Sequence, residues 1–149
     1  MDDSHTRVEQ VLATVEAVWA AYEAGSPEYF DFFTEDASVF PLSRPLRLQG
    51  REAYRRYFGR QFSLGKRASQ ILHPEVRLLG EGALVTYHHR IRTDFKSLDN
   101  RTTLLLVPDG GRLRIAHMHM SPLNSPQTST PGGLVEEVTL VEPPAAPSR

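Results

Sequence analysis

The chain of 149 residues has the size of one domain, and its 40% apolar and 23% charged residues are typical of a globular protein. No apolar run reaches the roughly 18 residues that crossing a bilayer requires. A net charge of −1 creates no electrostatic field that would attract nucleic acid or an anionic membrane, so we expect neither partner. The absence of cysteine excludes disulfides, a thiolate nucleophile and cysteine-ligated metals. The first residues lack the basic and apolar stretches of a secretory signal, which predicts a cytoplasmic location.

The N-terminal third has the period of an α-helix. Apolar residues three and four positions apart from His5 to Ala24 predict one amphipathic helix. Gly25 then matches a helix stop, and Ser26-Pro27-Glu28 matches the cap and first turn of a second helix, expected from Pro27 to about Thr34. The remaining expected elements are a short strand over 35–41, a third helix over about 50–62, and strands over 75–79, 83–92, 101–107 and 113–121.

Helices followed by consecutive strands with short turns predict an α+β fold, with the helices on one face of an antiparallel meander. Residues 1–122 form the expected domain. From Pro122 onward the chain holds six of its eleven prolines, so we expect residues 123–149 to be a proline-rich tail outside the core. Within that tail, residues 134–142 could add an edge strand.

Several short motifs carry a resemblance to a known superfamily. They are Val39-Phe40-Pro41 at the end of the short strand, Gly50-Arg51-Glu52-Ala53 before the third helix, and the segments 71–81 and 109–121. Over residues 8–122 the chain resembles the nuclear-transport-factor-2-like superfamily. The resemblance implies a cone-shaped fold of three N-terminal helices on a curved antiparallel sheet, with a habit of forming dimers or rings.

Within that superfamily, segments 71–81 and 109–121 are similar to the association domain of calcium/calmodulin-dependent kinase II, which carries a His-x-His-x-Ser pattern where this chain has His117, His119 and Ser121. Free-standing relatives include ketosteroid isomerases, scytalone dehydratase and SnoaL-type polyketide cyclases, and iota-class carbonic anhydrases are similar too. Ketosteroid isomerase activity is not expected, because its aspartate base is absent near residues 39–41 and Val18 stands where its oxyanion tyrosine would be.

Three histidines and a tyrosine are the candidate catalytic groups. Side chains alternate across a strand, so His89 shares a face with Tyr87, and His117 shares a face with His119. If the strands contain no bulge, all four side chains converge on a cavity between sheet and helices. We therefore predict that the three imidazoles act as acid–base catalysts and that Tyr87 positions the substrate.

Other interpretations of these histidines stay open. A histidine on an apolar strand face is often a core residue with a satisfied hydrogen bond. A His-x-His pair with a third histidine also has the spacing of a zinc site, but the sequence offers no identifiable carboxylate to orient the ligands. We therefore predict neither a metal nor a cofactor.

Aromatic residues of the predicted helices are candidates to line a cavity for a flat, oxygenated and largely apolar small molecule. Core packing is their alternative role. The candidate substrate-binding residues are Trp19, Tyr22, Phe33, Tyr54, Tyr57 and Phe58. The arginines of the third helix, Arg51, Arg55, Arg56 and Arg60, are expected to face solvent, although they could bind an acid or a carrier-protein phosphate.

The opposite face of the last two strands also carries apolar residues in strict alternation. These residues are Leu105, Val107, Ala116, Met118 and Met120. A sheet with two apolar faces needs a cover on both, which predicts a homodimer formed through this face.

The sequence thus favours a small-molecule enzyme that uses histidine acid–base chemistry in the isomerisation, cyclisation or dehydration of a polyketide-like or aromatic metabolite. One alternative is a non-catalytic ligand-binding or oligomerisation module of the association-domain type. A third possibility is an enzyme similar to the iota-class carbonic anhydrases.

Overall fold

The computed structural model describes residues 3–62, 65–94 and 96–123. The expected tail from residue 124 onward therefore lies outside the described residues. In chain order the elements are α1 (Asp3–Ala24), α2 (Glu28–Asp31), β1 (Phe33–Phe40), β2 (Leu48–Gln49), α3 (Arg51–Phe62), β3 (Arg67–Leu79), β4 (Gly82–Thr93), β5 (Ser97–Asp109) and β6 (Arg112–Pro122).

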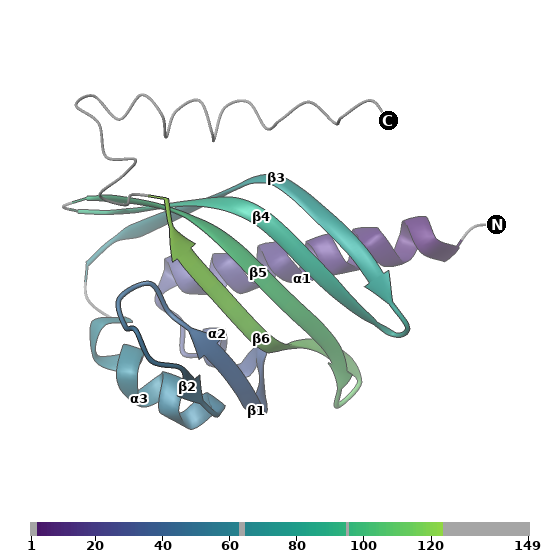
Figure 1. The fold of residues 1–149 in the computed structure, drawn as a ribbon, viewed down its shortest axis with the longest axis horizontal. Coiled ribbons are helices and arrows are strands. Elements are labelled where there is room, and N and C mark those ends of the chain that lie inside the picture. Colours follow the sequence, from purple (N-terminus) through teal and green to yellow (C-terminus); the bar gives the residue numbers. More distant parts are fainter. Residues whose placement is uncertain (1–2, 63–64, 95, 124–149) are drawn as a thin grey trace.

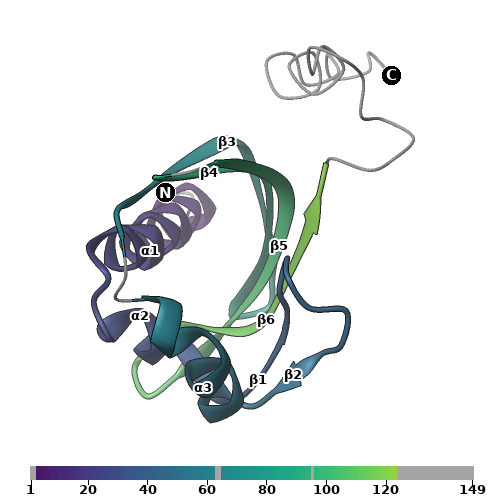
Figure 2. The same cartoon turned by 90° about the vertical axis from the view of Figure 1, so that its left-hand side faces the viewer.

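The strands form one six-stranded sheet in the order β2-β1-β6-β5-β4-β3 (Figure 1). Strands β3 to β6 make the antiparallel meander expected from the sequence, but β1 pairs with β6 in parallel, so the sheet is mixed. The sheet curves without closing, and the three helices lie on its concave side (Figure 2). The α+β class is therefore confirmed, and two details of the implied fold are corrected: the sheet is mixed instead of antiparallel, and only α1 and α2 precede all strands, as the predicted order of the strand over 35–41 and the helix over 50–62 indicated.

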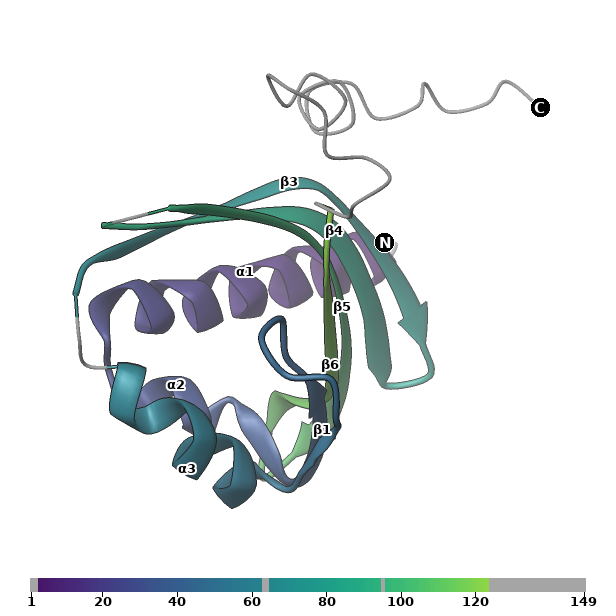
Figure 3. The same cartoon turned by 60° about the vertical axis from the view of Figure 1, so that its left-hand side comes forward.

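The long first helix packs its apolar stripe beneath the sheet. Figure 3 shows α1 running under β3 and β4, with α2 and α3 on the other side of the concave space. The stripe agrees with the predicted period, and its buried members are Val11, Val15, Val18, Trp19 and Tyr22. Within the described ranges, no helix is both long and apolar enough to span a bilayer.

The second helix is much shorter than predicted. It ends at Asp31, and the chain enters β1 at Phe33, although the sequence pattern predicted a helix to about Thr34. The reason is a sheet contact, since the backbone N–H of Ile115 on β6 donates to the carbonyl of Phe32 at 2.7 Å. Pairing with a strand more than eighty residues away ends the helix, and local residue preferences do not report such a partner.

Two strands are longer than predicted. The spacing of the predicted strands implies a turn over 96–100, but residues 97–100 belong to β5. The same pattern predicts that the edge strand starts at residue 75, whereas β3 begins at Arg67. The register of β3 against β4 shifts between Leu72 and Glu75, and His73 within this bulge has a φ of 56°. A bulge on an edge strand accommodates Pro74, which the prediction had treated as outside the strand.

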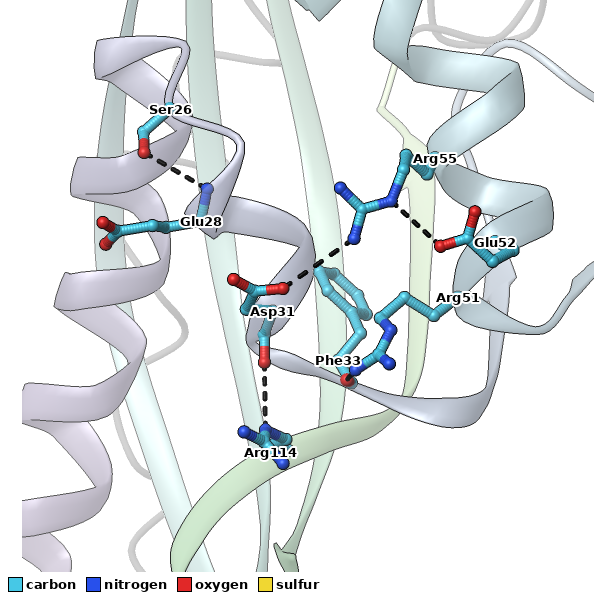
Figure 4. Close-up of polar contacts among 8 residues, drawn as sticks. All are labelled: Ser26, Glu28, Asp31, Phe33, Arg51, Glu52, Arg55 and Arg114. Atoms are coloured by element: carbon cyan, nitrogen blue, oxygen red, sulfur yellow. Dashed lines mark hydrogen bonds and ion pairs between the residues drawn. The ribbon is translucent and has the colours of Figure 1, made fainter. Parts of the chain in front are cut away.

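A set of polar contacts fixes α2 and α3 to the sheet (Figure 4). Arg51 donates to the carbonyl of Phe33 at 3.0 Å, and Arg114 donates to the carbonyl of Asp31 at 3.0 Å. Arg55 lies over the ring of Phe30 at 5.1 Å and also pairs with Glu52 and Asp31. The expectation that all α3 arginines only face solvent is therefore wrong for Arg51 and Arg55, which anchor the helix.

Candidate functional site

A cavity of about 350 Å³ opens between the helices and the concave face of the sheet. Its wall is mostly aromatic and aliphatic, and the charged lining residues all come from two segments at one edge of the cavity. The lining residues are Trp19, Tyr22, Tyr29, Pro41, Leu42, Ser43, Tyr54, Tyr57, Phe58, Gly65, Lys66, Arg67, Ile91, Thr93, Asp94, Lys96, Leu98 and Met120. A volume of this size fits a small organic molecule.

Five of the six aromatic residues proposed from the sequence line this cavity. The exception is Phe33, which is fully buried and packs against Tyr29 and Tyr54 with ring centroids 5.3 and 5.2 Å apart. Phe33 therefore belongs to the core beneath the wall. Tyr29, which the sequence analysis left out of the candidate list, lines the cavity in its place.

Two tyrosine hydroxyls in the cavity wall form a pair. The hydroxyls of Tyr29 and Tyr54 are 2.8 Å apart, and either oxygen can be the donor. Burial raises the pKa of both phenols well above the usual range, so both keep their protons at neutral pH. Two phenols hold two protons and their mutual hydrogen bond uses one, so the pair has one O–H to offer a ligand oxygen.

The side chain of His89 is fully buried just behind this wall. Its ring lies 4.3 Å from the ring of Trp19, and its Nε2 is 2.5 Å from the hydroxyl oxygen of Ser69. The other ring nitrogen, Nδ1, has no hydrogen-bond partner among the described residues. Burial lowers the pKa of His89 to about 3, so the imidazole is neutral at physiological pH. The position of His89 on the inner face agrees with the sequence-based expectation.

Tyr87 lies on the same face of β4 and bonds to the cavity wall. The indole N–H of Trp19 donates to the hydroxyl of Tyr87 at 2.6 Å, and burial raises the pKa of that phenol. Since an indole can only donate, Tyr87 is the acceptor and keeps its own O–H to give elsewhere. Neither Tyr87 nor His89 lines the cavity itself, whereas Trp19 lines it and contacts both residues.

Asn100 is a candidate residue that the sequence analysis missed. It lies directly opposite His89 on β5 and is fully buried, with its Oδ1 accepting from the hydroxyl of Thr102 at 2.6 Å. Its Nδ2 has no partner in the part of the chain that the structure describes. Asn100 had been assigned to a turn, yet the alternation of Asn100 and Thr102 with Leu104 and Leu106 was a readable sign of an inner strand face.

A bulge on β6 overturns the expected convergence of three histidines. Leu105 pairs with His117 and Leu106 pairs with Ile115, so Ala116 is an extra residue on β6. Beyond the bulge the alternation is reversed, and the side chains of His117 and His119 lie on the convex, outer face of the sheet. The prediction that they share the cavity with His89 was therefore wrong in its geometry.

The outward histidines have partners on β1. The Nδ1 of His117 is 2.6 Å from the hydroxyl oxygen of Ser38, and the Phe40 ring lies 5.6 Å from the ring of His117 and 5.1 Å from that of His119. Partial burial lowers the pKa of His117, and the neighbouring His119 lowers it further. These contacts give both rings a structural setting on the outer surface.

The same bulge changes which of the expected apolar residues lie on the outer face of the sheet. Met118 is fully buried and Met120 is 9% exposed, and both lie in the core with Met120 at the cavity wall. Their assignment to the outer face was wrong, because the sequence does not reveal the extra residue. Leu105 and Val107 lie on β5, whose alternation the extra residue on β6 does not change, and both are half-buried on the outer face as expected.

Three or more His, Asp or Glu side chains do not come together as a metal site anywhere in residues 3–62, 65–94 and 96–123. The chemistry available around the cavity therefore consists of one neutral imidazole, several protonated phenols, a buried amide and a group of charges at the edge.

Comparison with known proteins gives the chain a family context. A family model described as the SnoaL-like domain matches residues 11–125. A comparison with curated proteins finds no significant match.

Solved structures share the fold at low sequence identity. A protein of Streptomyces avermitilis, provisionally named a dehydratase of the NTF2-like family, is 20% identical with a TM-score of 0.75, covering 82% of this chain and 99% of that one. A protein of Novosphingobium aromaticivorans, provisionally named a scytalone dehydratase, is 12% identical with a TM-score of 0.73, covering 87% and 93%. The CaMKII hub homology domain of Chlamydomonas reinhardtii is 19% identical with a TM-score of 0.66, covering 78% and 98%.

Proposed function

The chain belongs to the SnoaL-like domain family, and we propose that it is a small-molecule enzyme that moves protons on a polyketide-like or aromatic metabolite. The observation that carries this proposal is His89, a neutral and fully buried imidazole behind an aromatic cavity wall, with a ring nitrogen that has no hydrogen-bond partner in the described part of the chain. Buried polar atoms normally have a partner, and exceptions are candidates for a functional role.

The chemistry follows from the protonation states. The neutral imidazole of His89 accepts a proton from a carbon next to a ligand carbonyl, and the electrons of that C–H bond move into an enolate. The spare O–H of the Tyr29–Tyr54 pair donates to the enolate oxygen. Because its pKa is about 3, His89 starts the reaction as a neutral imidazole with one N–H and one free lone pair. In the tautomer whose Nε2–H donates to the Ser69 hydroxyl, the lone pair lies on Nδ1, which is the nitrogen that accepts the proton.

The fate of that proton decides the product. Its return to a different carbon isomerises the ligand. Its transfer to a β-hydroxyl that leaves as water dehydrates the ligand. Attack of the enolate carbon on a second carbonyl of the same molecule, with the proton passing to the new alkoxide, closes a ring. All three reactions use the same base and the same oxyanion donor.

Access to His89 requires one movement in this proposal. Trp19 lines the cavity and packs against His89, which does not line it, so the proposal requires the indole to turn aside before a ligand contacts Nδ1 or the Asn100 amide. The Trp19–Tyr87 hydrogen bond would then break, leaving the Tyr87 hydroxyl to accept from or donate to the ligand.

The rival function is a binding or association module without catalysis. Solved neighbours with the names association domain and hub homology domain favour this alternative. The carbonic-anhydrase-like reaction loses its support, because the histidines on which it was based, His117 and His119, lie on the outer face.

Hydrogen exchange in heavy water tests the enzyme proposal without a known substrate. The protein is incubated in D2O with flat aromatic ketones and polyketide-like hydroxyketones, and mass spectrometry measures deuterium uptake at carbon. We expect His89→Asn to slow the exchange by about 10²- to 10⁴-fold. His88→Asn, the adjacent histidine on the outer face, is the matched control and should keep the wild-type rate.

Tyr54→Phe serves as a second variant that conserves the ring and removes one hydroxyl of the pair, so a folding defect in His89→Asn does not leave the question open. Full exchange in both His89→Asn and Tyr54→Phe contradicts the proposal. Ligand binding without any exchange in the wild type favours the binding module.

We also propose that two copies associate through the outer face of β4, β5 and β6. Leu84 and Leu105 are directly opposite each other on that face and half-buried, next to His117. Adjacent aliphatic side chains on an open sheet face are stabilised when a second surface covers them.

A further inference from the structure

The charges around the cavity are strongly one-sided. Among the lining residues only Lys66, Arg67, Asp94 and Lys96 carry charge, and they come from the start of β3 and the turn between β4 and β5. Arg67 pairs with Thr93 in the β3–β4 register, so the two segments lie side by side. Three cations therefore face one carboxylate at a single edge of an otherwise uncharged cavity.

The two lysines of this group are the only lysines in the chain, which otherwise uses arginine as its cation. Both are exposed, and neither forms an ion pair within the described residues. Lysine is a compact point charge on a long stem that follows a ligand group without a fixed geometry.

The carboxylate in this group already has a partner on the backbone. The Oδ2 of Asp94 accepts from the backbone N–H of Lys66 at 3.4 Å, which joins the two segments. Asp94 thus connects the backbone at Lys66 to the β4–β5 turn, and its single negative charge compensates only part of the positive charge.

The third cation, Arg67, is held in place at the border between the edge and the aromatic wall. Its guanidinium lies 5.0 Å from the ring centroid of Tyr22 and 4.8 Å from that of Phe62, and it donates to the carbonyl of Tyr22 at 3.2 Å. A cation stacked on two rings loses little further freedom when an anion arrives, so it is a prepared contact.

We propose that the cavity binds an organic acid, with its flat apolar body against the aromatic wall and its anionic group at the edge formed by Lys66, Arg67 and Lys96. This inference deepens the proposed function, on which it rests, by naming the charge of the ligand and the end at which it lies. The anionic group is a carboxylate or a phosphoryl group, which share the chemistry that these cations recognise.

Calorimetric titration of the full chain with matched probes tests the inference. The probes are 2-naphthoate, 2-naphthyl phosphate and the uncharged 2-naphthamide, with the benzene and anthracene analogues of each as further sets. We expect one of the two anions to bind about tenfold more tightly than the amide at low salt, from two exposed lysines and one half-buried arginine of modest individual effect. Salt should reduce that preference, because the edge is open to water. The anion that binds more tightly shows whether the edge prefers a carboxylate or a phosphoryl group.

The double variant Lys66→Gln/Lys96→Gln should lose most of the preference for the anion and leave the affinity for 2-naphthamide unchanged. The charge-matched control is Arg56→Gln/Arg77→Gln, which removes two exposed cations that do not line the cavity and should keep the preference. Both lysines are exposed, so the variant is expected to fold normally.

Equal binding of acid and amide to the wild type overturns the inference, and so does a preference that survives in the double lysine variant. In either case the proposed function stands if deuterium exchange still depends on His89. Failure of every probe in all three sets to bind overturns both the inference and the ligand cavity on which the proposed function depends.

Discussion

His88 and His89 follow one another on β4, and their side chains lie on opposite faces of the sheet. The ring of His88 is 6.3 Å from that of His73 on the outer surface, whereas the ring of His89 is 4.3 Å from that of Trp19 in the interior. The two residues share their backbone surroundings and differ in burial. They therefore form a pair in which one variant controls for the other.

The buried imidazole makes stability depend on pH. The pKa of His89 falls from 6.5 in the unfolded chain to about 3 in the folded protein. Between these values the unfolded chain binds more protons, so the free energy of unfolding decreases as the pH falls below 6.5, by up to about 1.4 kcal/mol per pH unit. We expect wild-type protein to lose about 2 kcal/mol more than His89→Asn between pH 7 and pH 5, as measured by urea unfolding.

His88→Asn is the control for this measurement. Burial and the nearby His73 and Arg101 also lower the pKa of His88, but its ring is only partly buried, so its contribution is smaller. His88→Asn should retain most of the wild-type pH dependence. Identical pH dependence of wild type and His89→Asn would show that His89 is not buried as a neutral group.

The hydrogen bond between Trp19 and Tyr87 should make a measurable contribution to stability. Tyr87→Phe removes the acceptor and leaves the indole N–H unpaired in a dry interior, which typically costs about 1–3 kcal/mol. Chemical unfolding followed by circular dichroism measures the loss. Tyr57→Phe is the matched control, because the Tyr57 hydroxyl bonds to Ser43 at the exposed mouth and its loss should cost much less. Equal losses in the two variants would contradict the prediction.

The elements with a strong local period were predictable from the sequence. The apolar stripe of α1 and the alternation of β4 determine these elements from the local sequence alone. Both elements match their predicted ranges within two residues. The short α2 and the start of β3 depend on pairing with distant strands. Local preferences carry no information about such pairing, so these boundaries were missed.

The positions of the candidate site residues were likewise predictable only where the strand alternation is uninterrupted. His89 and Tyr87 lie on an uninterrupted alternating strand, so their inner position followed from the sequence. His117 and His119 come after Ala116, and no residue type near that position marks a bulge. The opposed pair of His89 and Asn100 needed the β4–β5 register, which depends on where the turn lies and was misplaced by a few residues.

The bulge on β6 determines where a variant that tests the proposed homodimer must place its charge. A charge at Met118 would enter the core and unfold the monomer, so it says nothing about an interface. Leu105→Glu instead places a charge on the outer face, where an unpaired charge in a dry interface costs several kcal/mol. We expect it to convert dimer to monomer in analytical ultracentrifugation with little change in the monomer's unfolding. Leu46→Glu, at a 65% exposed loop position, is the control and should stay dimeric. An unchanged dimer in Leu105→Glu would exclude this face.

The Ala116 bulge itself can be tested by removing the extra residue. Deletion of Ala116 joins Ile115 directly to His117 and keeps the pairs Leu106–Ile115 and Leu105–His117, so Met118 and Met120 stay inward and His117 and His119 stay outward. We therefore expect the deletion variant to fold, with a loss of about 0.5–3 kcal/mol from the local change in the strand, as judged by circular dichroism and thermal unfolding. Ala116→Gly keeps the residue count and the bulge, so it should fold with a loss of about 1 kcal/mol or less. A deletion variant that does not fold, beside an Ala116→Gly variant that does, would contradict this prediction.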